Sequence, residues 1–155
     1  IGFGRLFGYD ISENMRYPLF QSNLSDYWNR WHMTLSGWCR NNVYFPVLGS
    51  TRNNVLALYS SFAVMGLWHN VSLNWVLWGV WHASGITFYS RWARYKKKLV
   101  KRLGFGLPGT VDHFIGVCIT CLYSGLGFSF IMFDSGDDMI ENTRNALSLL
   151  LAIFI

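Results

Sequence analysis

Two long stretches without a formal charge constrain this chain more than any other feature of its sequence. No Asp, Glu, Lys or Arg occurs from Asn53 to Ser90 or from His113 to Phe133. An α-helix needs about 20 predominantly apolar residues to cross the hydrocarbon core of a bilayer. The first stretch can hold two connected spans, or one span and a re-entrant segment, and the second can hold one span. We therefore predict a protein of the lipid bilayer rather than a water-soluble domain.

The composition agrees with a membrane location. Of the 155 residues, 52% are hydrophobic and only 14% are charged, whereas soluble domains carry about 25% charged residues. Aromatic residues make up 18% of the chain and include 8 Trp, and Trp and Tyr are enriched at membrane–water interfaces. The chain begins with Ile1 rather than Met. We expect it to belong to a longer membrane protein that continues beyond both ends.

Basic residues are concentrated directly after the first uncharged stretch. They are Arg91, Arg94, Lys96, Lys97, Lys98, Lys101 and Arg102. Such a cluster can bind nucleic acid, but loops on the cytoplasmic side of a span also carry an excess of Lys and Arg. Because the cluster follows an apolar run, we predict a cytoplasmic loop over 91–102 and no nucleic-acid partner. Contact with anionic lipid headgroups is compatible with this interpretation.

The pattern of apolar and polar segments predicts an all-α fold, a polytopic transmembrane helical bundle in which residues 1–155 form one partial membrane domain. Apolar residues at three- and four-residue spacing predict an interfacial helix over about 25–39. One face of this helix would carry Trp28, Trp31, His32, Leu35 and Trp38. Pro46 fixes its own φ and restricts the residue before it, so we expect a turn or short re-entrant loop over 40–54. Membrane segments are expected over about 55–68, 72–89, 111–133 and 146–155.

His69 is the strongest candidate for chemistry because it lies within the first uncharged stretch. Ionisable groups at membrane depth are costly and often functional. A neutral imidazole can accept a proton from a hydroxyl and return it later. The alternative is a structural His that donates a hydrogen bond between helices.

Polar residues near His69 suggest a channel. If a helix begins near Asn70, then Asn70, Asn74, Trp78 and His82 follow one above another at four-residue steps. For His82 we favour a structural hydrogen bond between helices. A second candidate, His32, follows Arg30 and Trp31, and this group could bind an anion or anchor an interfacial helix. The candidates for lining a substrate channel are Arg30, Trp31, Trp68, Asn70, Asn74 and Trp78.

Three segments of the sequence carry a resemblance to a known family: "ENMRYPLFQSNLSDYW", "YWNRWHMTLSGWCRNNVYFPVLGSTRN" and "GLWHNVSLNWVLWGVWHASG". They resemble the membrane-bound O-acyltransferases, and among them the alginate O-acetyltransferase type. The similarity is dense from Glu13 to Gly85, and the remainder agrees loosely as apolar spans. The RWH and GLWH elements are specific as a pair, whereas either alone is a weak signal.

The resemblance implies a multi-pass enzyme of the cell membrane with a buried channel. The family's central catalytic His matches His69, and its second His matches His32. The expected reaction moves an acyl group, acetyl in this branch, to a hydroxyl of an extracytoplasmic polysaccharide. We expect no metal, because the histidines lack carboxylate or thiolate companions at ligand spacing. We expect no bound cofactor, because the acyl thioester or other activated donor is a co-substrate. Expected partners are membrane lipid, the acyl donor or its carrier, the polysaccharide acceptor and an extracytoplasmic acyltransferase.

The chain departs from this branch at several positions. Asn70 replaces a usual Gly, Arg40-Asn41-Asn42 replaces Arg-Asp-Tyr, and Pro46–Ser50 contains one residue more than the usual Pro-Leu-Gly-Gly turn. These changes bear on the substrate more than on the reaction. A lipid or protein acceptor is therefore an alternative. A different class of function is a non-catalytic transporter or channel component, whose His and Asn side chains relay protons or bind a solute.

Overall fold

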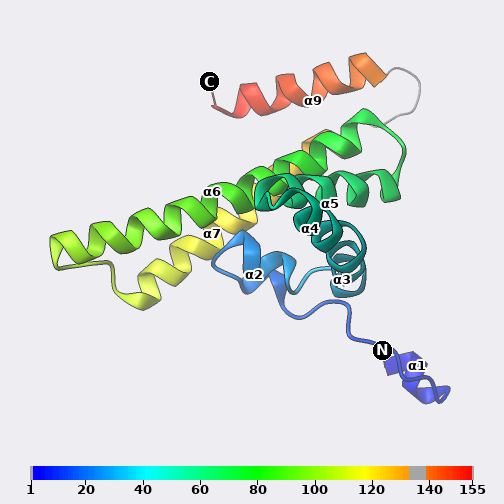
Figure 1. Cartoon of the computed structure of the whole chain (residues 1–155), viewed down its shortest axis with the longest axis horizontal. Helices are drawn as coiled ribbons and strands as arrows, with labels where there is room; N and C mark the ends of the chain where they lie inside the picture. The colour runs from blue at the N-terminus through cyan, green and yellow to red at the C-terminus, as the bar shows by residue number, and fades with distance from the viewer. Residues whose placement is uncertain (1, 133–138, 155) are drawn as a thin grey trace.

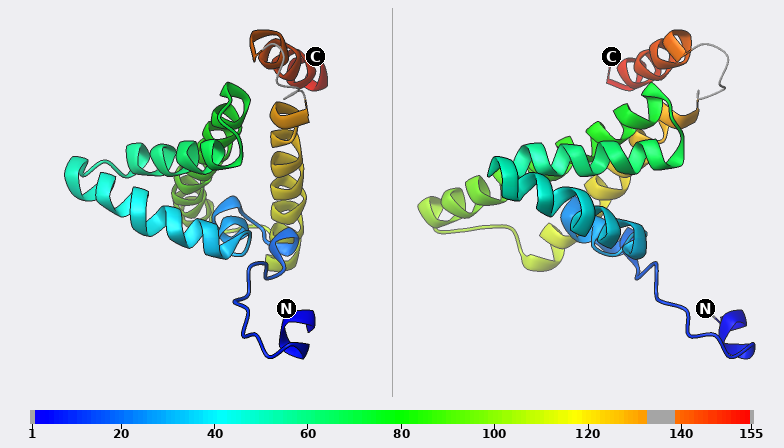
Figure 2. Two further views of the ribbon diagram at one scale, coloured as in Figure 1. Left: turned by 90° about the vertical axis from the view of Figure 1, so that its right-hand side faces the viewer. Right: turned by 45° about the vertical axis from the view of Figure 1, so that its right-hand side comes forward.

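In the computed structural model, which describes residues 2–132 and 139–154, all regular elements within these ranges are helical (Figure 1). They are α1 (Gly2–Leu6), η1 (Pro18–Phe20), α2 (Leu24–Trp28), α3 (Met33–Cys39), η2 (Arg40–Tyr44), α4 (Phe45–Thr51), α5 (Asn54–His69), α6 (Leu73–Leu103), α7 (Gly109–Gly127), α8 (Ser129–Met132) and α9 (Met139–Phe154). The all-α prediction is thereby confirmed. The predicted span ends Phe133 and Ile155 lie outside the described residues. Figure 2 shows α1 apart from the rest of the chain in both views.

The predicted interfacial helix over 25–39 is in fact two short helices. The side-chain oxygen of Asn23 caps α2 by accepting a hydrogen bond of 2.9 Å from the N–H of Asp26. After α2 the chain turns, and His32 adopts φ 46°, in the left-handed region, before α3 begins. The apolar spacing continues through this break, so the periodicity of the sequence gave no sign of it.

The turn expected over 40–54 lies only at the end of this range, at Arg52 and Asn53, because α3, η2 and α4 follow one another without interruption before it. The segment η2 is π-helical, and the N–H of Phe45 donates to the carbonyl of Arg40. Pro46 follows directly, inside this continuous helix. A proline inside a helix removes one backbone hydrogen bond and its ring crowds the preceding turn, and here that turn is the π-helical one. The helix ends at Arg52, which has φ 52°.

The helices α5 and α6 form a tight antiparallel pair. Asn53 caps α5, and Ser72 caps α6. Their backbones approach closely at Gly66 and Gly79. A Cβ added to Gly66 would lie 2.1 Å from the carbonyl oxygen of Trp75, and one added to Gly79 would lie 2.3 Å from that of Phe62. Both positions therefore require glycine for this packing.

The basic segment over 91–102 is helical rather than the predicted loop, because α6 continues to Leu103 (Figure 1). Arg and Lys are good helix formers, so a positive charge cluster does not by itself interrupt a helix. At 31 residues, α6 is roughly 46 Å long, which exceeds the roughly 30 Å of a hydrocarbon core. The helix ends at Gly104 with φ 74°. Helix α7 returns beside it, and Asp112 forms an ion pair with Lys96.

Within the described part of the chain, one stretch is long and apolar enough to cross a membrane, Gly109–Met132, which comprises α7 and α8. Only 28% of its most apolar window is buried inside the chain, whereas the core helix of a soluble protein is mostly buried. Large side chains such as Phe114, Ile119 and Leu122 point outward instead. Helix α5, with 16 residues, is shorter than the usual span of about 20.

The core of the bundle is centred on Trp28. Its ring meets those of Phe62, Trp78 and His82 edge to face, at centroid distances of 4.9, 5.7 and 5.1 Å. These rings come from α2, α5 and α6, so one indole joins three helices. Helix α9 is attached to α6 by a hydrogen bond from Thr143 to Asn74.

We predict that Gly79→Ala destabilises the full-length protein by about 1–3 kcal/mol, because the new methyl group would overlap the backbone of α5. The measurement is the midpoint of thermal unfolding in detergent. Gly125→Ala is the matched control, since a Cβ there meets nothing within 4 Å. Equal midpoints for the two variants would contradict the close packing of α5 and α6.

Candidate active site

His69 is the last residue of α5, and aromatic rings surround its exposed imidazole. Trp75 lies face to face with it, at a centroid distance of 4.5 Å and an interplanar angle of 16°. Trp68 and Trp78 meet it edge on, at 4.9 and 5.6 Å. The ring of His32 is 6.5 Å away. The structure therefore brings together the two histidines that the sequence singled out, with three indoles beside them.

The short connection between α5 and α6 presents His69. Asn70 ends α5 with an extended backbone, and its N–H donates to the carbonyl of Gly66 at 3.2 Å. The N–H of Ser72 then donates to the carbonyl of Asn70 at 2.9 Å. Asn70 therefore lies in the connection, and the predicted stripe of four polar residues on one helix is wrong in its first member.

His32 is held in its left-handed conformation by a distant segment of the chain. The carbonyl of Asn14 accepts a hydrogen bond of 2.9 Å from the N–H of Met33. Its side-chain oxygen accepts two more from Thr34, at 3.2 Å from the N–H and 2.9 Å from the hydroxyl. Asn14 thus caps α3 from outside and fixes the turn. Nδ1 of His32 is buried, and it has no hydrogen-bond partner among the described residues.

The ring centroids of the two imidazoles lie 6.5 Å apart. A neutral imidazole is suited to accepting a proton from a bound hydroxyl.

Arg30 and Trp31 support the turn that carries His32. The indole of Trp31 stacks on Tyr27 at 5.6 Å and 11°, against the core. The carbonyl of Arg30 accepts a hydrogen bond of 2.9 Å from the N–H of Arg16. Trp31 therefore contacts the bundle core, and Arg30 contacts the N-terminal segment.

Asn74 and His82 are buried on α6 and bond to other helices. Oδ1 of Asn74 accepts a hydrogen bond of 2.7 Å from the hydroxyl of Thr143. Nδ1 of His82 accepts one of 3.3 Å from Nε1 of Trp28. The interpretation of His82 as an interhelical hydrogen-bonding group is confirmed.

Sequence reasoning missed two residues of this region, Trp75 and Asn14. Trp75 does not fall at a helical spacing from His69, because the connection between α5 and α6 separates them. Asn14 lies in the irregular N-terminal part, where spacing carries no signal. Its position inside the segment "ENMRYPLF", which resembles the acyltransferase branch, was the available hint.

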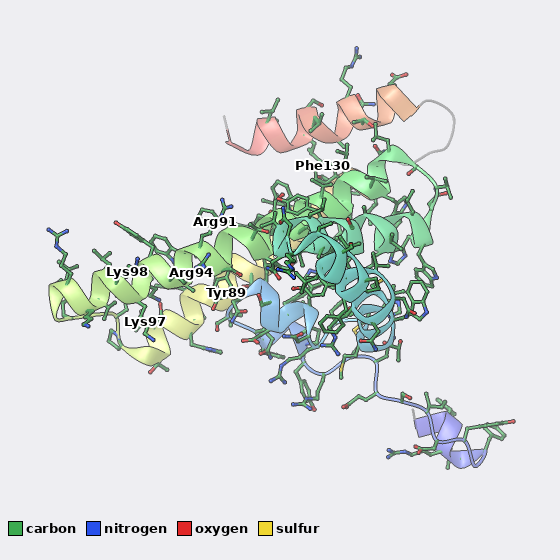
Figure 3. All side chains as sticks on the ribbon, viewed as in Figure 1. Tyr89, Arg91, Arg94, Lys97, Lys98 and Phe130 are labelled. Carbon is green, nitrogen blue, oxygen red and sulfur yellow. The ribbon has the colours of Figure 1, made fainter. Side chains whose placement is uncertain are left out.

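A cavity of about 640 Å³ is lined by residues that are near the two histidines in the sequence, but by neither histidine itself. Met33 and Met65 form part of its wall, one residue after His32 and one helical turn before His69. Three arginines also line it, Arg40, Arg91 and Arg94. Figure 3 shows Arg91 and Arg94 on α6. The cavity thus combines an apolar wall with positive charge, at a volume typical of small-molecule sites.

The described chain is thus a helical bundle with one helix of membrane-span length and two histidines close to each other. The profile of the MBOAT, membrane-bound O-acyltransferase family, matches residues 1–126, which is most of the chain. The chain belongs to this family, and the resemblance inferred from the RWH and GLWH elements is confirmed.

Relatives within the family share part of this sequence. The probable alginate O-acetylase AlgI of Pseudomonas fluorescens is 36% identical over 86 residues, which are 53% of this chain and 17% of that protein. The teichoic acid D-alanyltransferase of Bacillus subtilis is 32% identical over 108 residues, 63% of this chain and 27% of that protein. The peptidoglycan O-acetyltransferase of Helicobacter pylori is 29% identical over 102 residues, 63% of this chain and 19% of that protein. The chain thus spans well under half the length of these relatives.

We predict that His82→Leu destabilises the full-length protein by about 1–3 kcal/mol, because it leaves the buried N–H of Trp28 without its acceptor. His113→Leu makes the same exchange at an exposed position on α7, where substitutions usually change stability by less than about 0.5 kcal/mol. Thermal unfolding in detergent measures both. A stability of His82→Leu equal to that of the control would show that the hydrogen bond contributes nothing.

Proposed function

We propose that this chain forms part of a membrane O-acyltransferase in which His69 is the general base. The observation that carries the proposal is the approach of His69, at the end of α5, and His32, in the turn before α3, whose ring centroids are 6.5 Å apart. The family membership and the names of the relatives support acyl transfer as the reaction class. The acyl group is proposed to be acetyl, and the acceptor a hydroxyl of an extracytoplasmic polysaccharide.

In the proposed reaction, a ring nitrogen of His69 accepts the proton of the acceptor hydroxyl. The oxygen attacks the acyl carbonyl carbon of a thioester donor, and a C–O bond forms. The tetrahedral oxyanion collapses, the C–S bond breaks, and the departing thiolate takes the proton from the imidazolium. The products are an ester and a free thiol. Proton transfer by a positioned base of this kind contributes on the order of 10²–10⁴-fold to a rate.

His32 has a supporting role in this proposal. Its buried Nδ1, which has no partner among the described residues, offers a hydrogen-bonding group to a bound substrate. Its position depends on a strained backbone conformation that costs on the order of 1–3 kcal/mol, and such strain is often retained at functional sites. The rings of Trp68 and Trp78 contact His69 edge on, and Trp78 is buried in the core.

The donor is proposed to bind in the arginine-lined cavity. A thioester carrier that bears phosphate would pair with Arg40, Arg91 and Arg94, since guanidinium groups bind phosphate through paired hydrogen bonds. Its acyl end would then pass Met65 toward His69. The donor acts as a co-substrate in this scheme, and no bound cofactor or metal is required.

The proposed setting is a multi-pass protein of the cell membrane. The length of α6 supports this setting, because the uncharged residues from Leu73 to about Ser90 match the thickness of a hydrocarbon core in length. The remaining basic turns would project on the cytoplasmic side, as the positive-inside rule requires. A separate extracytoplasmic acyltransferase is the partner we propose for completing transfer to the polysaccharide.

We predict that His69→Ala reduces acyl transfer by the full-length protein in membranes by at least about 10²-fold. Labelled acetyl donor is supplied, and O-acetyl ester on cell-surface polysaccharide is measured at equal protein level. Full transfer by the variant would exclude His69 as the base.

Absence of transfer by the wild type would exclude the acetyl or polysaccharide assignment, and longer acyl donors with lipid and protein acceptors would then be tested. Loss of solute uptake, rather than of transfer, would indicate the transporter alternative.

We further predict that the double variant Arg91→Ala/Arg94→Ala raises KM for the donor about 10-fold with little change in kcat, because two contacts to anionic groups are lost. Lys97→Ala/Lys98→Ala is the matched control. It removes the same charge from the same helix (Figure 3), but neither lysine lies in the wall of the arginine-lined cavity. An equal rise of KM in both variants would point to general attraction by positive charge instead of a donor site.

A further inference from the structure

We propose that Trp75 is the positioning residue for His69, an inference that rests on the proposed role of His69 as the base. Among the described rings near His69, that of Trp75 alone is nearly parallel to the imidazole, at 4.5 Å and 16°. The rings of Trp68, Trp78 and His32 meet it at 77°, 81° and 69°. Trp75 therefore covers a face of the imidazole, while its edge, which carries the nitrogens, is left to other groups.

The backbone of Trp75 is fixed by the last turns of α5. A Cβ on Gly66 would lie 2.1 Å from the carbonyl oxygen of Trp75 and 2.7 Å from its carbonyl carbon. Gly66 precedes His69 by three residues, so both lie on one side of α5. The absence of a side chain at Gly66 thus lets the first turn of α6 approach closely enough for the indole to reach His69.

The indole of Trp75 is held from its other side as well. Trp78 meets it at 5.6 Å and 66°, and Trp78 is itself buried against Trp28 in the core. The N–H of Trp75 lies 3.5 Å from the capping hydroxyl of Ser72. Backbone contact, helix cap and core packing together orient the indole, and the indole in turn orients His69, which is otherwise exposed at a helix end.

Two physical effects give this stacking a consequence for rate. A parallel indole restricts rotation of the imidazole plane, so the nitrogen points in a constant direction, and a misplacement of about 1 Å can cost on the order of 10²-fold in rate. An indole face also attracts a cation, by about 0.5–2 kcal/mol. When His69 takes the proton, the indole face therefore stabilises the resulting imidazolium more than it stabilises the neutral imidazole. Both effects act on the chemical step and leave substrate binding unchanged.

The test compares kcat and KM for Trp75→Leu, Trp75→Phe and His69→Ala in the full-length protein in membranes. We expect Trp75→Leu to lower kcat about 10- to 100-fold and to leave KM for donor and acceptor within about 3-fold. Trp75→Phe, which keeps an aromatic face, should recover most of kcat. Trp92→Leu is the matched control, since Trp92 lies on the same helix but is 45% exposed on the basic turns, and it should behave as the wild type.

Gly66→Ala provides a second test that leaves the indole intact. Its methyl group would push Trp75 away from His69, so we expect a loss of kcat similar to that of Trp75→Leu. Gly49→Ala is its control, because a Cβ there meets nothing within 4 Å. If Gly66→Ala lowers the amount of folded protein, the comparison of Trp75→Leu with Trp75→Phe remains decisive.

The outcomes separate the two proposals. Wild-type kcat in Trp75→Leu together with inactive His69→Ala would overturn the positioning role and leave the proposed function intact. A change in KM without a change in kcat would also overturn it, since Trp75 would then contact substrate instead. Full activity of His69→Ala would refute the proposed function itself. Loss of kcat in Trp75→Leu that phenylalanine does not restore would show that a face-to-face ring is not what the site requires.

Discussion

The close contact between α5 and α6 at Gly66 and Gly79 is the constraint on which the rest of this structure depends. It fixes the short connection after His69 and therefore the direction in which the imidazole points. It also sets the rotation of α6, so that Trp78 and His82 face Trp28 while Asn74 faces α9. Lipid tails are as apolar as most side chains, so helices in a bilayer associate mainly through such close backbone approach and through buried polar bonds. This pair of helices uses both.

Much of the helical framework could be predicted from the sequence, because long uncharged stretches are a local property of the sequence and indicate helices that avoid water. The uncharged stretch from Asn53 to Ser90 indicated the helices that became α5 and the first part of α6. The error at 91–102 has a simple origin. The positive-inside rule concerns the side of the membrane on which charges lie, and it carries no information about backbone conformation. Similarly, Pro46 predicted a turn, although it lies inside a continuous helix directly after the π-helical η2.

The candidate site was predictable only in part. An ionisable residue within an uncharged stretch is a local signal, and it identified His69. The break before α3 is different, because it depends on hydrogen bonds that Met33 and Thr34 donate to Asn14, which no periodicity near His32 could reveal. Trp75 was not predicted as a site residue, for a related reason. Its stacking on His69 results from the path of the chain between two helices and from the missing side chain of Gly66, and both are features of tertiary structure.

The unbroken course of α6 has a consequence for how this chain can vary in length. The first turn of the helix carries Trp75 beside His69, and Arg91 and Arg94 line the cavity further along the same helix. Each residue inserted into an α-helix rotates everything beyond it by about 100° and advances it by 1.5 Å. A single insertion near Tyr89 would turn both arginines off the cavity while leaving the histidine end in place. We therefore expect a change of length to be tolerated in the irregular segment 104–108 and not in the helix before it.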